Sequence, residues 1–210
     1  MPDFSFERRI LSRHPNAIVA GIDEAGRGPW AGPVVAAAVV FDLDAAPKQI
    51  CARLDDSKKL SPAVRERLFD ELTRSDSVSS GVGIADVEEI DRHNILQATY
   101  LAMHRAVTNC PRAIDHALVD GNRAPKLPCA VDTIVKGDGL SLSIAAASVI
   151  AKVTRDRMMK ALAAQFPGYG WETNAGYGTA QHQSALAVRG VTPHHRRSFA
   201  PIRALLESGA

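Results

Sequence analysis

Two apolar runs near the beginning of the chain, residues 17–22 and 34–41, constrain the fold more than any other feature of the sequence. Both runs are rich in small and β-branched apolar residues and both are bounded by Gly and Pro, which is typical of β-strands. The loop between them, "DEAGRGPWAGP", is short, and a short loop favours an antiparallel pair of neighbouring strands. The run 34–41 is far too short to span a bilayer, so we expect no membrane segment.

The rest of the chain predicts an α/β layer with a five-stranded mixed sheet flanked by helices. Strands alternate with helices along the chain, and this alternation is typical of such a layer. Three further strands are expected at residues 78–86, 116–121 and 132–138. After a short polar or helical lead-in at 1–16, helices are expected at 47–54, 62–74, 87–109, 141–164, 179–189 and 201–207.

The size and composition of the chain favour a single domain. The chain has 210 residues, of which 46% are hydrophobic, and this is enough for one good core. We expect one domain over residues 1–210, with an α/β core at about 17–165 and a C-terminal extension of loop and helices at about 166–210. A net charge of only +2 is low for a non-specific nucleic-acid coat, so an anionic partner needs a local patch.

The cysteine pattern indicates the compartment. Cys51, Cys110 and Cys129 are widely spaced, odd in number and form no CxxC pair. Reduced thiols fit this pattern better than a disulfide framework or a zinc site. The first 17 residues also lack the apolar segment of a signal peptide. We therefore expect a cytoplasmic protein.

Acidic residues stand at the end of three expected strands. The first strand ends in Asp23-Glu24, the fourth in Asp120 and the fifth in Asp138. Strand ends and loops form the site edge of an open α/β sheet, and carboxylates that converge there repel one another unless cations bind. Carboxylates without His or Cys suit Mg²⁺ or Mn²⁺. Two such ions could activate a water and stabilise the leaving oxygen of a phosphodiester.

The acidic pair leaves an alternative open. Neighbouring strand residues point to opposite faces, so Asp23 and Glu24 share a site only if the strand ends or bulges between them, which Gly26 permits. Taken singly, each acid is more often a solvated charge at a strand end. The repetition of the arrangement at three strand ends favours the metal site.

The "GRGP" segment, with Gly26, Arg27 and Gly28, follows the acidic pair. Its glycines allow the backbone to approach a ligand closely, and Arg27 adds a guanidinium suited to phosphate. A dinucleotide-binding loop is disfavoured because the G-x-G-x-x-G spacing fails and a strand follows instead of a helix. The alternative is a tight hairpin turn without a binding role.

A polar stripe is expected along the helix at 141–164. Ser148, Lys152, Arg155 and Asp156 fall at i, i+4, i+7 and i+8, on one face of an otherwise apolar helix. Because this helix begins just after Asp138, the stripe could face the acids. A solvated stripe is at least as common an outcome for such a pattern.

Basic patches and aromatic residues give weaker signals. Lys58 in "DSKKLS" and residues 194–197, "HHRR", suit phosphate backbones, although isolated charge runs usually decorate a surface. Tyr169, Trp171 and Tyr177 lie in one glycine-rich loop. Aromatics in such a loop can stack on a sugar or base, or can form a small core, which is the more usual role for Trp171.

Several long motifs closely resemble bacterial ribonuclease HII. They are "GIDEAGRGPWAGPVVAAAVV", "DDSKKLS", "VDGN", "KGDGLSLSIAAASVIAKVTRD", "GYGTAQH" and "HHRRSFAP", and they run from about residue 17 to 203. The resemblance implies an RNase H-like fold and a metal-dependent endonuclease that cuts the RNA strand of RNA–DNA hybrids. It also implies incision 5′ of single ribonucleotides in duplex DNA, which leaves 5′-phosphate and 3′-hydroxyl ends.

The resemblance also implies roles for individual residues. The family's four metal-binding acids correspond to Asp23, Glu24, Asp120 and Asp138. Its Gly-Arg-Gly loop, which recognises the ribonucleotide 2′-hydroxyl, corresponds to residues 26–28. We expect Mg²⁺ or Mn²⁺, with two ions per site when substrate is bound.

Further substrate contacts are expected from the resemblance, the polar stripe and the basic patch. Tyr177 falls on the tyrosine of the family's Gly-Tyr-Gly segment, which packs against the sugar on the 3′ side of the ribonucleotide. Lys58, Ser148 and Lys152 are additional expected contacts to substrate. The expected partners are RNA–DNA hybrids and ribonucleotide-containing duplex DNA, bound by a monomer.

Three other functions are weighed against this one. A nuclease or transferase of the same fold that acts on DNA would cleave all-DNA substrates, and the Gly-Arg-Gly loop and Tyr177 disfavour it. A module that binds hybrids without cutting them would lack at least one of the four acids, and none is missing. A nucleotide-cofactor enzyme is disfavoured by the failed glycine spacing.

Overall fold

The structure is a computed structural model that describes residues 1–208, and its centre is a five-stranded mixed sheet. The sheet has the order β3-β2-β1-β4-β5; β1–β2 and β2–β3 are antiparallel, and β1–β4 and β4–β5 are parallel. The predicted mixed sheet and its antiparallel first pair are confirmed. The strands are β1 (Val19–Ala25), β2 (Val34–Phe41), β3 (Val78–Ala85), β4 (His116–Asp120) and β5 (Ala130–Ile134).

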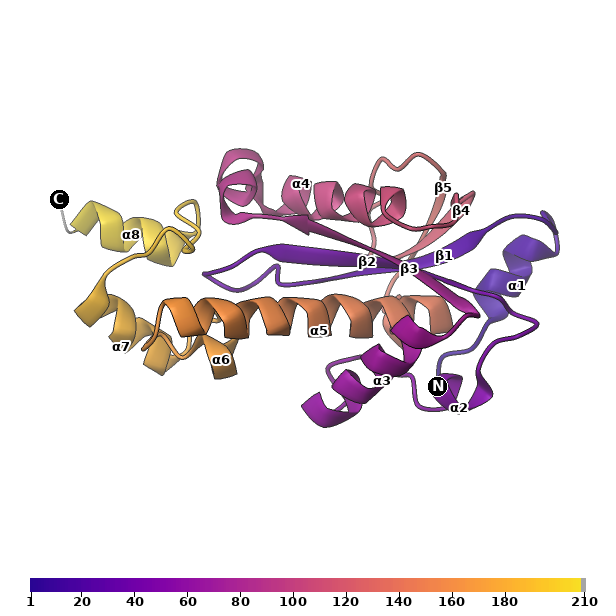
Figure 1. Cartoon of the computed structure of the whole chain (residues 1–210). Coiled ribbons are helices and arrows are strands. Elements are labelled where there is room, and N and C mark those ends of the chain that lie inside the picture. Colours follow the sequence, from indigo (N-terminus) through magenta and orange to yellow (C-terminus); the bar gives the residue numbers. More distant parts are fainter. Residues whose placement is uncertain (209–210) are drawn as a thin grey trace.

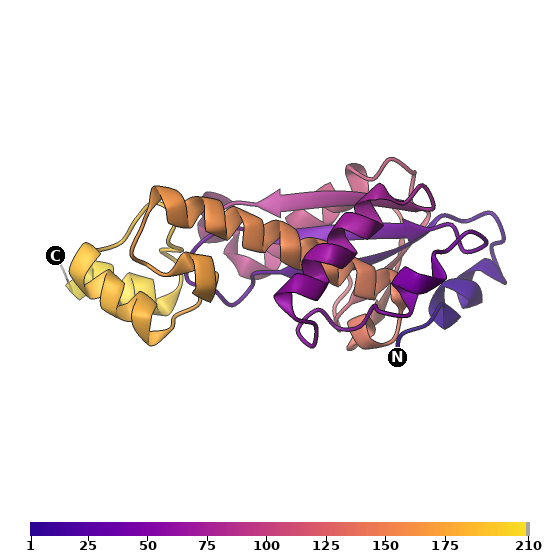
Figure 2. The same ribbon diagram turned by 60° about the horizontal axis from the view of Figure 1, so that its bottom comes forward.

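Helices cover both faces of the sheet, with α4 on one face and α5 on the other (Figure 1). In the turned view α3 lies beside α5, and α6 to α8 gather at the end of the molecule far from α1 and α2 (Figure 2). The helices are α1 (Ser5–Leu11), α2 (Lys48–Cys51), α3 (Pro62–Arg74), α4 (Val87–Thr108), the 3₁₀ helix η1 (Gly137–Gly139), α5 (Leu142–Gln165), α6 (Trp171–Asn174), α7 (Ala180–Arg189) and α8 (Ala200–Ser208).

The apolar run of β2 explains why the sheet is covered on both sides. Alternate residues of a strand point to opposite faces. Ala36 and Ala38 pack in the cluster that contains α4, whereas Ala37 and Val39 pack in the cluster that contains α5. Every residue of β2 is therefore buried, and small side chains allow the helices to approach the sheet closely. A Cβ added to Gly83 would lie 2.0 Å from the Ala102 carbonyl oxygen, so α4 packs directly on the backbone of β3.

Helix ends follow local sequence signals. Ser61 caps α3, as predicted, because its side chain accepts a hydrogen bond from the Val64 N–H at 3.4 Å. Asp86 and Glu89 form a capping box at the start of α4. The helix expected at 87–109 is not continuous, since Asn94 has φ 67 and interrupts it. The Asn94 carboxamide accepts from the N–H groups of Leu96 and Gln97 and so begins the second segment.

The C-terminal extension has a small core of its own. Tyr169, Trp171, Leu186 and Ile202 pack together there, and Met159 of α5 joins them. This cluster attaches the extension to the C-terminal part of α5. Within residues 1–208, no helix combines the length and the apolar character that a membrane crossing requires.

Candidate active site

Asp23 and Glu24 lie inside β1, which does not end at residue 22 as the sequence suggested. The strand continues to Ala25 with unbroken pairing to β2, and only its pairing with β4 stops at Ile22. Alternation then places the two side chains on opposite faces. Asp23 is 6% exposed and lies on the same face of β1 as Gly21, which packs on α5. Glu24 is half-buried and lies on the same face as Ile22, which packs in the cluster that contains α4.

Asp120 and Asp138 approach the same end of the sheet from its parallel half. Asp120 is the last residue of β4. The strand predicted at 132–138 is wrong in its bounds, because β5 runs from Ala130 to Ile134 and Lys136 adopts a left-handed turn with φ 58. Asp138 therefore lies on η1 and not on a strand. The Gly137 N–H donates to Asp120 Oδ1 at 2.7 Å, which ties this turn to β4.

The four carboxylates, which we call the acidic group, affect one another electrostatically. Burial and the neighbouring Glu24 and Asp120 carboxylates raise the pKa of Asp23 well above its ordinary value. Burial also raises the pKa of Glu24, with Asp120 adding to the rise and Arg27 opposing it. Burial and Asp120 raise the pKa of Asp138. The like charges are thus close enough to repel one another, and a cation would relieve that repulsion.

The donor chemistry of the acidic group fits a hard divalent cation. All of its donors are carboxylate oxygens, which Mg²⁺ and Mn²⁺ prefer. Within residues 1–208, however, no three His, Cys, Asp or Glu side chains are already gathered into a set that could hold an ion. The carboxylates would have to turn towards one another to close around it. The fit therefore rests on ligand type, burial and mutual repulsion.

A hollow of about 290 Å³ lies beside Asp23 on the α5 face. The hollow brings together most of the residues singled out from the sequence. Tyr177 is 48% exposed, and a Cβ on Gly28 would meet its ring at 3.4 Å, so the ring lies next to the loop. The lining residues are Asp23, Glu24, Ala25, Gly26, Arg27, Gly28, Ser57, Lys58, Ser148, Lys152, Arg155 and Tyr177.

Lys58, Ser148 and Lys152 reach this hollow with neighbours that orient them. Ser148 Oγ donates to Ser57 Oγ at 2.6 Å, which joins α5 to the "DSKKLS" segment. Lys152 Nζ pairs with Asp156 Oδ1 at 2.6 Å along α5. The nearby acids, with Asp56 first, raise the pKa of Lys58 although burial alone would lower it. Lys58 therefore stays charged next to the acidic group.

Asp120 lines a second hollow, of about 330 Å³, on the α4 face. Glu24 and Arg27 line both hollows, and Arg27 Nη1 approaches Glu24 Oε1 to 3.4 Å. Tyr100 and Arg123 belong to this second hollow as well. The acidic end of the sheet thus has an open space on each face, joined at β1 and the loop that follows it.

Two arginines near the site have a role that the sequence patterns did not reveal. Arg155, predicted to belong to an exposed or site-facing stripe, is 1% exposed, and Arg196, predicted to belong to a basic surface patch, is 0% exposed. Both bind backbone carbonyls of residues 26–33, which we call the glycine loop. Arg155 is followed directly by Asp156 and Arg157, and Arg196 stands in "HHRR", so neither residue looks like a buried one in the sequence.

The aromatic residues of the C-terminal extension divide into two groups. Tyr169 and Trp171 are buried in its core, as the alternative for Trp171 anticipated, whereas Tyr177 is exposed. His195, also from the "HHRR" segment, is fully buried and lies 3.0 Å from His182, Nε2 to Nε2. Half of that predicted basic patch is therefore interior structure.

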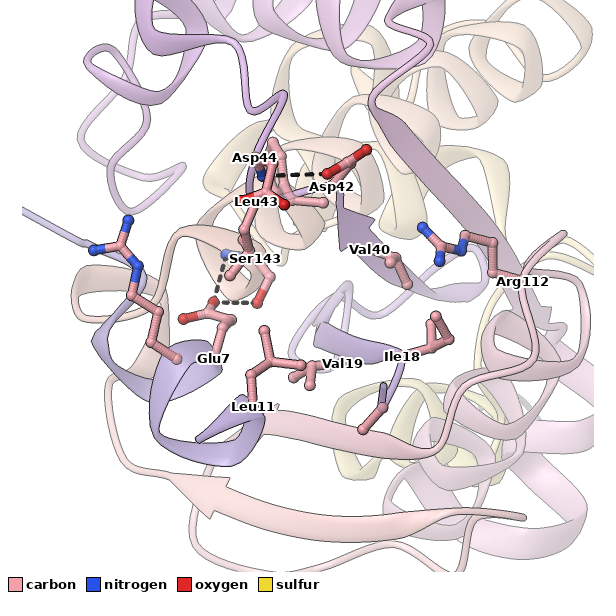
Figure 3. A pocket seen from close by; sticks show the side chains of 13 residues that line it. Glu7, Leu11, Ile18, Val19, Val40, Asp42, Leu43, Asp44, Arg112 and Ser143 are labelled. Carbon is pink, nitrogen blue, oxygen red and sulfur yellow. Dashed lines mark hydrogen bonds between the residues drawn. The ribbon is translucent and has the colours of Figure 1, made fainter. Parts of the chain in front are cut away.

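A third hollow, of about 420 Å³, lies at the opposite end of β1 from the acidic group (Figure 3). Glu7 of α1 borders it and is 2% exposed. Its Oε1 atom accepts from Ser141 Oγ at 2.6 Å and from the Ser143 N–H at 3.1 Å. These bonds anchor α1 to the start of α5, so this buried acid belongs to the scaffold and not to the acidic group.

The fold and the acidic group together define a class of protein. A mixed sheet of this order, with helices on both faces and carboxylates at the end of its central strands, is the arrangement of a metal-dependent nuclease with an RNase H-like fold. The model of one family, "Ribonuclease HII", matches residues 20–202. The chain belongs to the ribonuclease HII family.

Relatives and solved structures agree with this assignment. The ribonuclease HII of Rhodospirillum rubrum is 60% identical over 210 residues, covering 100% of this chain and 94% of the relative. That of Paramagnetospirillum magneticum is 60% identical over 202 residues, covering 96% and 97%. The ribonuclease H2 structure from Pyrococcus horikoshii OT3 has a TM-score of 0.77 at 28% identity, covering 90% of this chain and 97% of that one.

A more distant structure supports the fold alone. The Bst-RNase HIII structure in complex with Mn²⁺ has a TM-score of 0.74 at 20% identity, covering 91% of this chain and 70% of that one. The predicted RNase H-like fold is confirmed. By family the chain is a metal-dependent endoribonuclease of the ribonuclease H type, which acts on RNA–DNA hybrids.

Proposed function

We propose that this ribonuclease HII incises duplex DNA on the 5′ side of a single embedded ribonucleotide and leaves 5′-phosphate and 3′-hydroxyl ends. The observation that carries the proposal is one hollow of about 290 Å³ lined by Asp23, Glu24, the Gly26–Gly28 segment and Tyr177. Groups able to hold cations thus lie next to groups able to recognise a ribose. A single strand passing through the hollow would meet both.

The acidic group would hold the metal in this proposal. Asp23, Glu24, Asp120 and Asp138 supply only carboxylate oxygens, and three of them have a raised pKa because burial and repulsion oppose their charge. Two Mg²⁺ or Mn²⁺ ions, when bound there, supply activation of the attacking water and stabilisation of the leaving oxygen. Lys58 and Lys152 add positive charge at the phosphate backbone beside them.

The Gly26–Gly28 segment and Tyr177 would select the ribonucleotide. The 2′-hydroxyl both donates and accepts hydrogen bonds and is the group that distinguishes RNA from DNA at a site. Arg27 and Gly28 are exposed residues, and their backbone N–H groups, which donate to no other group among the described residues, are free to donate to this hydroxyl. The ring of Tyr177, next to Gly28, is placed to pack against the sugar on the 3′ side.

We further propose that the chain works as a monomeric single domain in the cytoplasm. The C-terminal extension is bonded to the glycine loop, which supports one catalytic unit rather than two. The three cysteines of the described chain are free, as expected of a reducing compartment. A sizing column with light scattering tests the monomer.

The test uses a labelled DNA duplex with one ribonucleotide, an all-DNA duplex of the same sequence, and a long RNA–DNA hybrid, each with Mg²⁺. We expect a single cut 5′ of the ribonucleotide, no cut in the all-DNA duplex, and no turnover when the metal is omitted. Cleavage of the hybrid without incision at the single ribonucleotide would overturn the proposed role of the loop and Tyr177. Cleavage of the all-DNA duplex would instead indicate a DNA nuclease of the same fold.

A further inference from the structure

Two buried guanidinium groups hold the glycine loop from behind. Arg196 donates from Nη2 to the Gly26 carbonyl at 2.6 Å, from Nη1 to the Arg27 carbonyl at 2.9 Å and from Nε to the Gly32 carbonyl at 2.9 Å. Arg155 donates to the carbonyls of Pro33 at 2.9 Å and Ala31 at 3.1 Å. The glycine loop between β1 and β2 reaches towards the C-terminal helices (Figure 1), and Arg196 lies in the segment between α7 and α8.

Burial of two such charges calls for a reason beyond packing. In the described part of the chain, every hydrogen bond of the two side chains goes to a backbone carbonyl, and neither forms an ion pair. Burial lowers the pKa of Arg155 to about 10 and that of Arg196 to about 9. Burying a cation costs free energy, and without an ion pair only the hydrogen bonds to these carbonyls offset that cost.

The geometry of the peptide bond turns these contacts into an orientation. In a planar trans peptide the C=O and the N–H of the next residue point in opposite directions. Because Arg196 binds the Gly26 and Arg27 carbonyls from the interior, the N–H groups of Arg27 and Gly28 point away from the interior. Neither N–H donates to another group among the described residues. Both residues are exposed at the hollow beside the acidic group.

The fit between loop and arginine leaves little freedom. Gly26 has φ +99, and a Cβ there would lie 2.0 Å from Arg155 Nε. The loop is also bonded through its backbone, since Trp30 N–H donates to Gly176 O at 2.8 Å and Arg196 N–H donates to Trp30 O at 2.8 Å. A carbonyl that accepts from a cation also polarises its own peptide group, which strengthens the outward N–H as a donor.

We propose that Arg155 and Arg196 are positioning residues for substrate selection: they fix the glycine loop so that the N–H groups of Arg27 and Gly28 face the ribose 2′-hydroxyl. This inference rests on the function proposed above. The two arginines do not touch substrate. They act by keeping the carbonyls inward, and the fork shape of the guanidinium is required because one group must reach several carbonyls at once.

The test compares binding with and without a 2′-hydroxyl. Fluorescence anisotropy in metal-free buffer gives the Kd for a DNA duplex with one ribonucleotide and for the same duplex made of DNA alone. The discrimination is the Kd for the all-DNA duplex divided by the Kd for the duplex with one ribonucleotide. We expect Arg196→Gln to lower this ratio by about tenfold, while the Kd for the all-DNA duplex stays unchanged. A purely structural defect would weaken both duplexes alike and leave the ratio as it was.

Two conservative variants make the test independent of folding losses. Arg196→Lys and Arg155→Lys keep the buried charge but cannot bind several carbonyls together, so we expect each to lower the ratio as well. Arg105→Gln is the matched control, because Arg105 also binds a carbonyl, that of Ile84, but lies on α4 away from the loop. We expect its ratio to equal that of the wild type.

The outcomes separate the two proposals. A wild-type ratio near one would overturn the recognition role of the loop, and this inference with it. A wild-type preference for the ribonucleotide that survives in folded Arg196→Gln and both lysine variants would overturn the positioning role alone. A preference lost in Arg196→Gln but kept in both lysine variants would show that charge suffices and would overturn the requirement for the guanidinium fork.

Discussion

The acidic group and the glycine loop border the same hollow, but the charged side chains at these two places have opposite surroundings. The carboxylates repel one another, and the positive charges of Arg27 and Lys58 offset this repulsion in part. The cationic side chains behind the loop are instead sealed inside and saturated by backbone carbonyls. The acidic group is therefore the incomplete half of the hollow, because the chain does not balance its negative charge and a cation would have to do so. The glycine loop with Arg155 and Arg196 is the completed half, because the chain itself supplies the partners of both charges.

Asp138→Asn should give the largest effect, because it removes charge from the incomplete half. We expect cleavage to fall by about 10³-fold while hybrid binding persists. Thermal stability without metal should be unchanged or higher, since one repulsive charge is gone. Initial rates with Mg²⁺ and a melting curve measure both. Asp132→Asn, an acid on β5 that pairs with His116, is the control, and equal activity in the two variants would remove Asp138 from the site.

Gly26→Ala tests the completed half. The new methyl group would collide with the Arg155 side chain and occupy a left-handed conformation, so we expect a loss of about 3 kcal/mol in unfolding free energy. Gly139→Ala, beside the acidic group, meets no atom within 4 Å and should leave the unfolding free energy nearly unchanged. Denaturant titration of both variants decides, and equal stabilities would contradict the tight fit.

Acid should lower the free energy of unfolding through His195, which precedes Arg196 in the chain. Its Nδ1 accepts from the Thr192 N–H at 2.9 Å, and burial lowers its pKa from 6.5 to about 4. The unfolded chain therefore takes up the proton first, so the stabilisation is full above pH 6.5 and is lost as the pH falls towards 4. The loss amounts to about 3 kcal/mol.

Denaturant titrations between pH 7.5 and 4 would measure this loss. His195→Gln should flatten the pH dependence over that window, whereas His116→Gln, on β4 outside the C-terminal extension, should not. An unchanged slope in His195→Gln would mean that another group carries the acid sensitivity.

The sequence predicted those parts of the fold that depend on local pattern. One example is the run at 34–41, because a strand buried on both faces is apolar at every position. Another is the cap at Ser61, because a serine directly before a proline marks the start of a helix. The bounds of β5 differ from the predicted 132–138 because an edge strand ends where its pairing with β4 ends, at Asp120↔Ile134, and its own apolar residues do not mark that point.

The sequence predicted the types of residue in the site but not the buried residues that hold the glycine loop in place. The acids were found because they recur near strand ends, although β1 runs through Asp23 and Glu24 and separates their side chains. The sequence leaves Arg155 either on a solvated stripe or facing the acids, and it places Arg196 in a basic surface patch, because charge in a sequence predicts exposure. Only the three-dimensional structure shows carbonyls from a loop more than 120 positions away, as for the 122 positions between Arg155 and Pro33.

The bond from Arg196 to the Arg27 carbonyl spans 169 positions of the chain, and this distance has a consequence for biosynthesis. Ribosomes add residues from the N-terminus onwards, so residue 196 is added roughly 10 to 30 s after Arg27. During that interval the glycine loop of the nascent chain has no Arg196 to donate to its carbonyls. On the proposal that Arg196 positions this loop, competence to select a ribonucleotide arises only after synthesis has passed Arg196, and unfinished copies would not select targets in the nucleic acids around them.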